Sequence, residues 1–408
     1  ADEFVFNLTS PKYYKGKNVP TTLSSTDFEL KFVYGTHEET LNLFDNQTGL
    51  GNFTIKSYAN NTSAGIATVV FEAIGTSNFT GTVAKQFVIS PKDIATSDDL
   101  LIDLPTPTSK VGDLNLYRYN MGEVKPQLEI SDNGEKLELN KDYQVVYTNC
   151  QRVSHDTNGT MISSTMPTAT IIFKGNYTGR LSKTYGISKI ALTIDDVTFD
   201  LPTPTYTGSE IRISPSMIKM KLKETLFSKA YSFTVNDFVL TRDGFFENTS
   251  ENINATSLDG LGNYTQENKG KFKVKFAGSA SDVFAGEFEI EFNIARRDIS
   301  QANFNDNFFA SETYTGTNIG KDYEVSFGGQ TLVLDKDYTL TYKDNKNVGQ
   351  ATVTVKAVEG SGAHNFKGST DITFAINPKD IADEDISFEV TETPNYNYGR
   401  AISLSSAS

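Results

Sequence analysis

Hydrophobic and polar residues alternate in many short segments of this chain. In residues 271–276 the alternation places Phe272, Val274 and Phe276 on one face and three lysines on the other. Residues 351–356 alternate in the same way. A period of two is the pattern of a β-strand with one buried face. Runs with the 3.6-residue period of a helix are scarce, so the pattern predicts an all-β protein.

One series of motifs recurs along the chain and is most regular in residues 314–381. It consists of Tyr-Thr-Gly at 314–316, Asp-Tyr-x-x-x-Tyr at 337–342, Asn-Phe-Lys-Gly at 365–368 and Phe-x-Ile-x-Pro-Lys-Asp-Ile at 374–381. Internal repetition of this kind predicts a tandem array of similar domains. We therefore expect repeat 1 in residues 1–92, repeat 2 in 93–190, repeat 3 in 191–298, repeat 4 in 299–379 and the start of an incomplete fifth repeat in 380–408.

The first three repeats carry weaker forms of the same motifs. In repeat 1, Phe53 stands one residue too far from Tyr58 to match the Asp-Tyr motif. In repeat 2, Asn149 follows Tyr147 where an Asn is expected, and in repeat 3, Phe238 stands for the first Tyr. Repeats 1 and 2 match best in their second halves, and repeat 3 matches least.

The motifs predict local structure inside each repeat. Roughly six or seven short alternating segments per repeat are typical of an immunoglobulin-like β-sandwich with two antiparallel sheets. The Tyr of the Asp-Tyr motif is expected to bury its ring and to place its hydroxyl on a backbone group at the rim of a sheet. The glycine that ends the Asn-aromatic motif is expected to supply the hairpin turn into the last strand. These glycines are Gly81, Gly179, Gly286 and Gly368.

The joins between repeats are short. Residues 89–94, 294–299 and 376–381 connect the last strand of one repeat to the first strand of the next with few residues, often including Pro. Such joins leave little slack. We therefore expect an elongated, beaded rod of stiffly connected domains.

Two insertions interrupt the motif series, at residues 150–166 in repeat 2 and at residues 244–269 in repeat 3. Loops on a rigid sandwich often carry recognition, so these insertions are candidate specificity elements. The alternative is that they are tolerated surface insertions without a function. Residues 217–229 are the nearest candidate for a helix.

Charge and cysteine content exclude several classes of protein. The net charge of −14 argues against binding to nucleic acid or to an anionic membrane, because both require clustered Lys and Arg. The single cysteine, Cys150, excludes an intrachain disulfide, and we expect it to be a half-buried small residue rather than a nucleophile. No apolar run approaches the ~18–20 residues of a membrane span.

Acidic residues recur near predicted turns but do not form a recognisable site. Turn capping is the favoured interpretation, and a weak Ca²⁺ site is the alternative. No Gly-x-Ser-x-Gly elbow points to a catalytic triad. We expect no catalytic, cofactor-binding or metal-binding residues. The acidic residues concerned are Asp132, Asp142, Asp237, Asp335, Asp337 and Asp344.

Taken together, the Asp-Tyr-x-x-x-Tyr-x-x-Asn, Asn-Tyr-Thr-Gly and Phe-x-Ile-x-Pro-Lys-Asp-Ile motifs resemble those of tandem bacterial Ig-like repeats. Such repeats occur in large surface proteins of Gram-positive bacteria, in adhesins and S-layer proteins, and in some phage fibres. The resemblance covers repeat 4 throughout and the second halves of repeats 1 and 2. It implies a spacing, adhesive or lattice-forming role outside the cell and no catalytic residues.

These observations lead to one functional hypothesis and one alternative. The hypothesis is a non-enzymatic extracellular rod at a bacterial cell surface, acting as a stalk, adhesin or S-layer or filament component. Its partners would be a host or matrix protein, a glycan, or copies of itself. The alternative is a phage virion fibre or decoration protein that contacts the host surface or glycans. The chain starts at Ala1 without an initiator Met or an apolar leader, which fits a secreted protein whose signal peptide has been removed.

Overall fold

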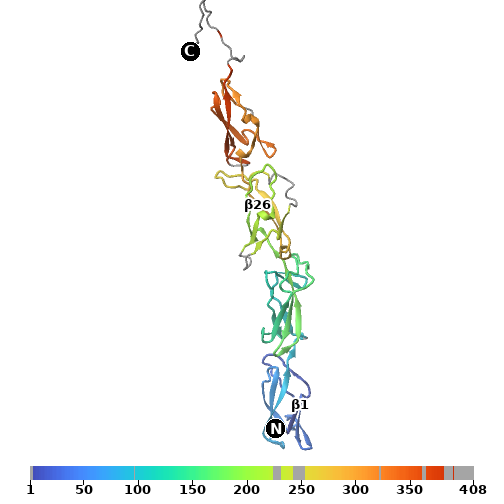
Figure 1. Ribbon diagram of the computed structural model, residues 1–408. Coiled ribbons are helices and arrows are strands. Elements are labelled where there is room, and N and C mark those ends of the chain that lie inside the picture. Colours follow the sequence, from blue (N-terminus) through green and yellow to red (C-terminus); the bar gives the residue numbers. More distant parts are fainter. Residues whose placement is uncertain are drawn as a thin grey trace, which may run out of the picture. The chain divides into compact units, whose positions relative to one another are not determined.

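The computed structural model describes residues 3–95, 97–223, 231–241, 253–320, 323–360, 364–380 and 389. Within these residues the chain consists of β-strands joined by tight turns (Figure 1). Helical structure there is limited to single turns, namely α1 (Ala280–Val283), η1 (Ile194–Asp196), η2 (Pro215–Met217), η3 (Ile299–Gln301) and η4 (Asp306–Phe308). The predicted all-β fold class, with β-sandwich domains in tandem, is confirmed.

Repeats 1 and 2 are each built from small, mainly antiparallel sheets. Repeat 1 contains the sheets β1 (Phe4–Leu8), β3 (Phe28–Tyr34), β4 (His37–Leu41) and β2 (Lys12–Tyr13), β7 (Thr82–Ser90), β6 (Gly65–Ala73), β5 (Phe53–Ala59). Repeat 2 contains β13 (Glu135–Lys136), β12 (Glu129–Asp132), β9 (Leu100–Asp103), then β14 (Tyr143–Thr148), β15 (Thr168–Phe173), β17 (Arg180–Thr184), and finally β10 (Ser109–Val111), β11 (Leu114–Arg118), β18 (Gly186–Ser188).

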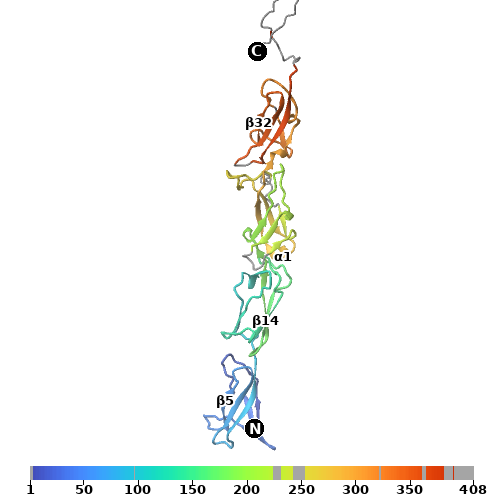
Figure 2. The same cartoon turned by 60° about the vertical axis from the view of Figure 1, so that its left-hand side comes forward.

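Repeats 3 and 4 follow the same plan. Repeat 3 contains β20 (Val197–Asp200), β21 (Lys219–Leu222), β22 (Ser232–Phe233) and the sheet β23 (Phe238–Thr241), β24 (Gly270–Phe276), β26 (Glu287–Phe292). Repeat 4 contains β28 (Asn303–Phe304), β30 (Val325–Phe327), β31 (Gln330–Thr331) and the sheet β29 (Glu312–Thr313), β35 (Ser369–Asn377), β33 (Gly349–Ala357), β32 (Tyr338–Lys343). The strands that contain the Asp-Tyr motif, β5, β14 and β32, are labelled in Figure 2, and each lies at the edge of its sheet.

Three further strand pairs connect consecutive repeats. In each pair, the segment that leaves the last strand of one repeat lies parallel to the Asn-aromatic motif of the next repeat. The pairs are β8 (Lys92–Asp93) with β16 (Tyr177–Thr178), β19 (Ile190–Ala191) with β25 (Phe284–Ala285), and β27 (Arg297–Asp298) with β34 (Phe366–Lys367).

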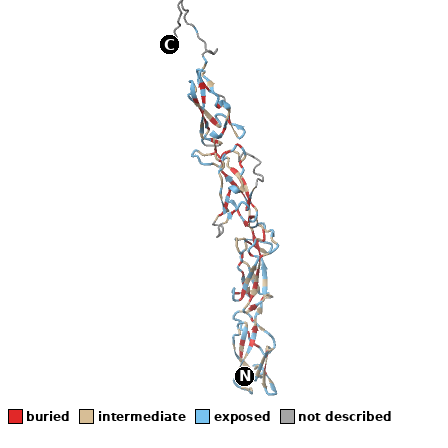
Figure 3. Cartoon of the chain, in the orientation of Figure 1, coloured by how far each residue is buried: buried red, intermediate tan, exposed pale blue. Residues whose placement is uncertain are grey.

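The chain forms two compact units. Unit 1 contains repeats 1 and 2 together with residues 276–286 of repeat 3, and unit 2 contains the remaining described residues of repeat 3 and those of repeat 4. In unit 1, the buried side chains of repeats 1 and 2 form one continuous hydrophobic cluster. Buried and exposed residues alternate along the strands (Figure 3). In β24, Phe272, Val274 and Phe276 are buried as the sequence pattern predicts.

The mismatch at Phe53 has a structural explanation. Strands β5 and β6 pair on both sides of a register shift between Ile55 and Ser57, so Lys56 is the extra residue of a β-bulge. A bulge inserts one residue without changing which face the flanking side chains occupy. Phe53 and Tyr58 therefore both keep the positions that the motif requires.

The turn predictions hold, but the helix prediction is wrong. The glycines of the four Asn-aromatic motifs all have positive φ, at 85° for Gly81, 112° for Gly179, 134° for Gly286 and 78° for Gly368. In the candidate helix 217–229, the described part runs from Met217 at the end of η2 into strand β21. Met220 and Leu222 are buried on one face of this strand, so its lysine-rich sequence follows a period of two.

Candidate functional sites: the repeat junctions and a groove in repeat 2

The junction between repeats 1 and 2 begins with backbone pairing. After β7 the chain passes directly into repeat 2, where Lys92 N–H donates to the Asn176 carbonyl (2.9 Å) and Ile94 N–H donates to the Thr178 carbonyl (3.1 Å). The Ile94 side chain is fully buried in the core that the two repeats share. The connecting segment is therefore also part of the fold of repeat 2.

Side chains close the same junction. Tyr14, from the Tyr-Lys-Gly motif of repeat 1, lies edge-on to Tyr177 with 5.4 Å between the ring centroids. Both rings are buried, and burial raises the pKa of each hydroxyl. The side-chain oxygen of Asn176 accepts a hydrogen bond from the Ala64 N–H (2.8 Å). Aromatic pairs of this geometry contribute roughly 0.5–1.5 kcal/mol beyond their buried area.

An ion pair adds to this junction. The ammonium group of Lys92 lies 2.9 Å from both carboxylate oxygens of Asp132, which is buried. At its rim, Lys17 of repeat 1 pairs with Glu135 of repeat 2 at 3.3 Å. Removing one partner of a buried pair is costly because the remaining charge is left without compensation.

The junction between repeats 3 and 4, which lies within unit 2, uses the same contacts. Arg297 N–H donates to the Asn365 carbonyl (2.9 Å), and Tyr206 lies edge-on to Phe366 with 5.4 Å between the centroids. The side-chain oxygen of Asn365 accepts from the Ala255 N–H (2.8 Å). The aromatic pair and the amide-to-backbone hydrogen bond of the first junction are thus reproduced with different residues.

The face that each repeat presents to the next can now be defined. The donor face is a Tyr together with a backbone N–H, as in Tyr14 with Ala64 and Tyr206 with Ala255. The acceptor face is the Asn-aromatic-x-Gly motif of the following repeat. In repeat 3, Val283 stands at the Asn position of this motif, so that acceptor face has no side-chain amide.

The glycine of the acceptor face makes room for the incoming segment. A Cβ atom on Gly179 would lie 2.8 Å from the Cβ of Ala95, and one on Gly286 would lie 2.3 Å from the Leu192 carbonyl oxygen. Both distances are shorter than a van der Waals contact, so a side chain would displace the segment. The glycine in the hairpin thus serves the junction as well as the turn.

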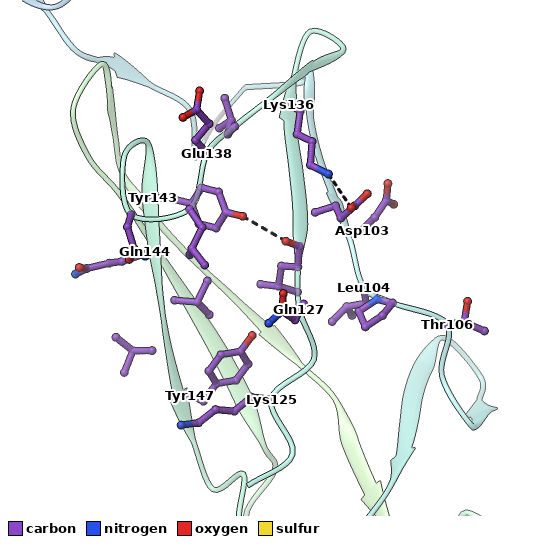
Figure 4. A pocket seen from close by; sticks show the side chains of 18 residues that line it. Asp103, Leu104, Thr106, Lys125, Gln127, Lys136, Glu138, Tyr143, Gln144 and Tyr147 are labelled. Atoms are coloured by element: carbon purple, nitrogen blue, oxygen red, sulfur yellow. Dashed lines mark hydrogen bonds and ion pairs between the residues drawn. The ribbon is translucent and has the colours of Figure 1, made fainter.

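Repeat 2 also contains a groove of about 1100 Å³ along the outer edge of β14 (Figure 4). Its far wall is the segment 124–128, in which buried Val124, Pro126 and Leu128 alternate with exposed Lys125 and Gln127. Figure 4 shows Tyr143 and Tyr147 projecting from β14 toward this segment. Within the described residues β14 pairs with β15 alone, so its other edge faces the groove.

Tyrosine hydroxyls hold the far wall of the groove in place. Tyr143 donates to the Leu128 carbonyl (3.3 Å), Tyr147 donates to the Pro126 carbonyl, and Tyr185 donates to the Val124 carbonyl (2.6 Å). Desolvation by burial raises the pKa of all three hydroxyls. The expected contact of the Asp-Tyr tyrosine with a rim carbonyl is confirmed at Tyr143 and, in repeat 4, at Tyr338, which donates to the Tyr323 carbonyl (3.4 Å).

Cys150 occupies the position that Asn fills in two other repeats. Asn61 in repeat 1 and Asn345 in repeat 4 each accept a backbone hydrogen bond from one residue and return a side-chain amide to the carbonyl of that same residue, Thr21 (3.2 Å) or Ile319 (2.8 Å). In repeat 2, Cys150 accepts the same backbone bond from Val124 but has no amide to return. Cys150 is fully buried rather than half-buried, and the prediction that Asn149 is the motif Asn is wrong by one residue.

The missing amide is replaced by a distant hydroxyl. Tyr185 donates to the carbonyl of Val124, which is the group that the amide would have reached. The corresponding residues of repeats 1 and 4 are Phe87 and Phe374, each two residues before the isoleucine that pairs with the start of β6 or β33. The substitution of Asn by Cys in one strand is therefore matched by Tyr instead of Phe in another.

The two insertions share one local structure. In repeat 2, Ser154 N–H donates to the Ile187 carbonyl (2.8 Å) and its hydroxyl accepts from Ile187 N–H (2.9 Å). In repeat 3, Thr256 and Ile294 exchange the same two bonds at 2.9 and 2.8 Å. His155 is buried beside Ser154, with 2.8 Å between the hydroxyl oxygen and His155 Nδ1. The base of each insertion therefore belongs to the framework of its repeat.

Each insertion turns back on an aspartate. Asp156 accepts from the backbone N–H groups of Asn158 and Thr160, and Asp259 accepts from those of Leu261 and Asn263, all at 2.8–2.9 Å. Leu261 at this turn is 89% exposed. The hypothesis that the insertions carry specificity thus narrows to their tips, while residues 244–252 of the second insertion lie outside the described part of the chain.

The acidic residues of the Asp-Tyr motifs cap turns, as predicted. Asp142 accepts from Glu138 N–H (2.9 Å), Asp237 from Thr234 N–H (2.7 Å) and Asp337 from Val333 N–H (2.8 Å). Asp132 instead forms the junction ion pair. Among the described residues, no group of three or more His, Cys, Asp or Glu side chains could hold a metal ion. In the same residues, no helix is long and apolar enough to span a membrane.

Comparisons with known proteins do not assign the chain to a family. No family model and no curated protein matches it. Among solved structures, the extracellular cadherin domains 3–6 of protocadherin gamma B2 are 9% identical over 92% of this chain and all of that one, with a TM-score of 0.17. Domains 1–6 of the surface layer protein SbsC are 11% identical over 93% of this chain and 50% of that one (TM-score 0.16), and the human desmocollin-1 ectodomain is 9% identical over 95% and 81% (TM-score 0.16).

Proposed function

We propose that this chain is a non-enzymatic extracellular structural protein that mediates assembly or attachment at a bacterial cell surface. The observation that carries the proposal is the junction, in which an aromatic pair, an asparagine amide and a parallel strand pair join consecutive repeats twice with the same geometry. Repeat proteins derive their stability from such nearest-neighbour contacts. Side chains devoted to joining domains suit a protein whose task is to connect or to space.

The role would be that of a stalk, an adhesin or an S-layer or filament component. The net charge of −14 favours solubility of a protein exposed to solvent. The partners would be copies of the chain, or a host or matrix protein or glycan. A phage virion fibre or decoration protein is the alternative, because it needs the same architecture and the same kind of partner.

Surface labelling of the source cells tests this proposal. Antibodies raised against the full chain should label intact cells, and brief external proteolysis should remove the signal before the cells lyse. Labelling that appears only after lysis would refute an extracellular role. Co-sedimentation of the chain with virus particles, without labelling of uninfected cells, would decide for the phage alternative.

The groove in repeat 2 supports a second role, the binding of an extended glycan or peptide. It combines an unpaired strand edge with exposed polar groups, which include Gln127 and Lys125. Arrays of glycans and matrix peptides should be probed with the full chain and with the Gln127→Arg variant, which fills the groove. The control is Gln350→Arg, an exposed glutamine on β33 in repeat 4. Equal binding by both variants would exclude the groove as the binding site.

A further inference from the structure

Repeat 4 presents a donor face that no described residue covers. Tyr314 N–H donates to the Asn377 carbonyl (2.9 Å), as Tyr14 N–H donates to the Ser90 carbonyl (2.9 Å), so Tyr314 corresponds to Tyr14. Val348 precedes the glycine that pairs with Ile376 and thereby takes the place of Ala64. Repeat 4 thus carries both parts of the face that repeats 1 and 3 use at their junctions.

The exposure of these residues shows what is missing. Tyr14 is 5% exposed and Tyr206 is 3% exposed, because each is covered by the aromatic ring of the following repeat. Tyr314 is only partly buried, against Ile319 and its neighbours in repeat 4. Val348 is 52% exposed, which is unusual for an apolar side chain in a strand-rich domain.

Repeat 1 presents the complementary acceptor face at residues 78–81. Ala73 N–H donates to the Gly81 carbonyl (3.0 Å), as Phe173 N–H donates to that of Gly179 (3.1 Å), so the hairpin is already formed. A Cβ on Gly81 would meet nothing within 4 Å, whereas the space beside Gly179 holds the incoming segment. Asn78 is exposed and Phe79 is half-buried.

We propose that the donor face of repeat 4 in one copy of this chain docks onto the acceptor face of repeat 1 in a second copy. Tyr314 would lie edge-on to Phe79, and Val348 N–H would donate to the side-chain oxygen of Asn78. Both halves of a contact that the chain uses twice internally are present on one molecule, which is why a second copy is the occupant. The inference rests on the proposed role in assembly and specifies its surfaces.

The two faces differ, so the contact is heterologous. A heterologous contact links copies head to tail into a ring or an open series, in contrast to the closed pair that a self-complementary face gives. Inside one chain, covalent connection raises the effective concentration of the faces to the order of millimolar. Between copies this help is absent, so association is expected in roughly the 10 µM to 1 mM range.

Light scattering and sedimentation of the full chain over that range test the proposal. The average mass should rise with concentration. Asn78→Ala should weaken association about tenfold, the effect of one lost hydrogen bond. Val348→Asp should abolish association, and because Val348 is exposed the fold should be retained. Asn46→Ala and Tyr34→Ala, at exposed positions in repeat 1 away from the face, are the controls.

Mixing two variants distinguishes this contact from any other. A chain with a blocked acceptor face (Gly81→Val with Asn78→Ala) and a chain with a blocked donor face (Val348→Asp) should each be monomeric alone. An equimolar mixture should form a pair and nothing larger, because one intact donor and one intact acceptor remain. A monomeric unmodified chain at every concentration, or undiminished association of Val348→Asp, would overturn the proposal. Neither result would bear on surface labelling, which tests the proposed function separately.

Discussion

Removing the hydroxyl of Tyr185 should destabilise repeat 2 although the ring stays in place. The hydroxyl donates to the Val124 carbonyl at 2.6 Å, and the Tyr185 side chain is completely buried. In Tyr185→Phe this carbonyl would lose its donor at a site that water does not reach. A buried acceptor left without a partner costs about 1–3 kcal/mol. We therefore expect Tyr185→Phe to lower the local free energy of unfolding by about 2 kcal/mol.

A second substitution should restore that loss. Repeats 1 and 4 satisfy the equivalent carbonyl with an asparagine amide and carry Phe at the position of Tyr185. Cys150→Asn alone should destabilise repeat 2, because the larger side chain enters a filled core. Combined with Tyr185→Phe, it should supply the missing donor. The double variant should then be more stable than the sum of the two single changes predicts, by about 1–2 kcal/mol.

Native-state hydrogen exchange is the suitable assay, because several domains in one chain do not unfold in a single transition. Exchange of the β14 and β15 amides reports the stability of repeat 2 directly. Tyr147→Phe is the matched control, since its hydroxyl lies at the open groove where water can replace it, and it should cost less than Tyr185→Phe. Additive effects of Tyr185→Phe and Cys150→Asn would refute the exchange of one donor for the other.

Three further predictions concern the junction and the buried histidine. Gly179→Ala should destabilise the junction of repeats 1 and 2 by about 1–3 kcal/mol more than Gly81→Ala destabilises repeat 1, as measured by hydrogen exchange, because both have positive φ but the added methyl meets the incoming segment at Gly179 alone. Asn176→Ala should cost about 1 kcal/mol in the same assay, whereas Asn78→Ala should be neutral in the monomer; equal costs would contradict the role of the amide. Burial lowers the pKa of His155 below its ordinary value of 6.5, so the unfolded state binds the proton more readily. The stability of repeat 2 should be complete above that value and fall as the pH drops through it, and His155→Gln should remove this dependence.

Much of the local structure could be predicted from the sequence because it depends on neighbouring residues. The period of two in residues 271–276 determines which side chains of β24 are buried. The turn glycines follow from the need for positive φ. The candidate helix failed because Met220 and Leu222 alternate with lysines inside a strand, and the length of that segment was too short to separate the two periods.

The features that the sequence did not indicate depend on residues far apart in the chain. Tyr119 has the same backbone contact as Tyr14 in its repeat, its N–H donating to the Ser188 carbonyl (2.9 Å), but the Tyr-x-Gly spacing is lost there and the motif was missed. The link between Cys150 and Tyr185 joins two strands through one carbonyl and leaves no local trace. Comparing the four repeats at the Phe87 position would have shown a Tyr where others carry Phe, which is the one available signal.

The junction explains why folding and connection cannot be separated in this chain. Ile94 completes the core of repeat 2, yet it lies in the segment that leaves repeat 1. Lys92, one strand pair earlier, neutralises Asp132 inside repeat 2. The atoms that stabilise the second repeat are therefore the atoms that hold it to the first. Loosening the junction should cost stability as well as contact, and selection for a folded repeat would preserve a connected one.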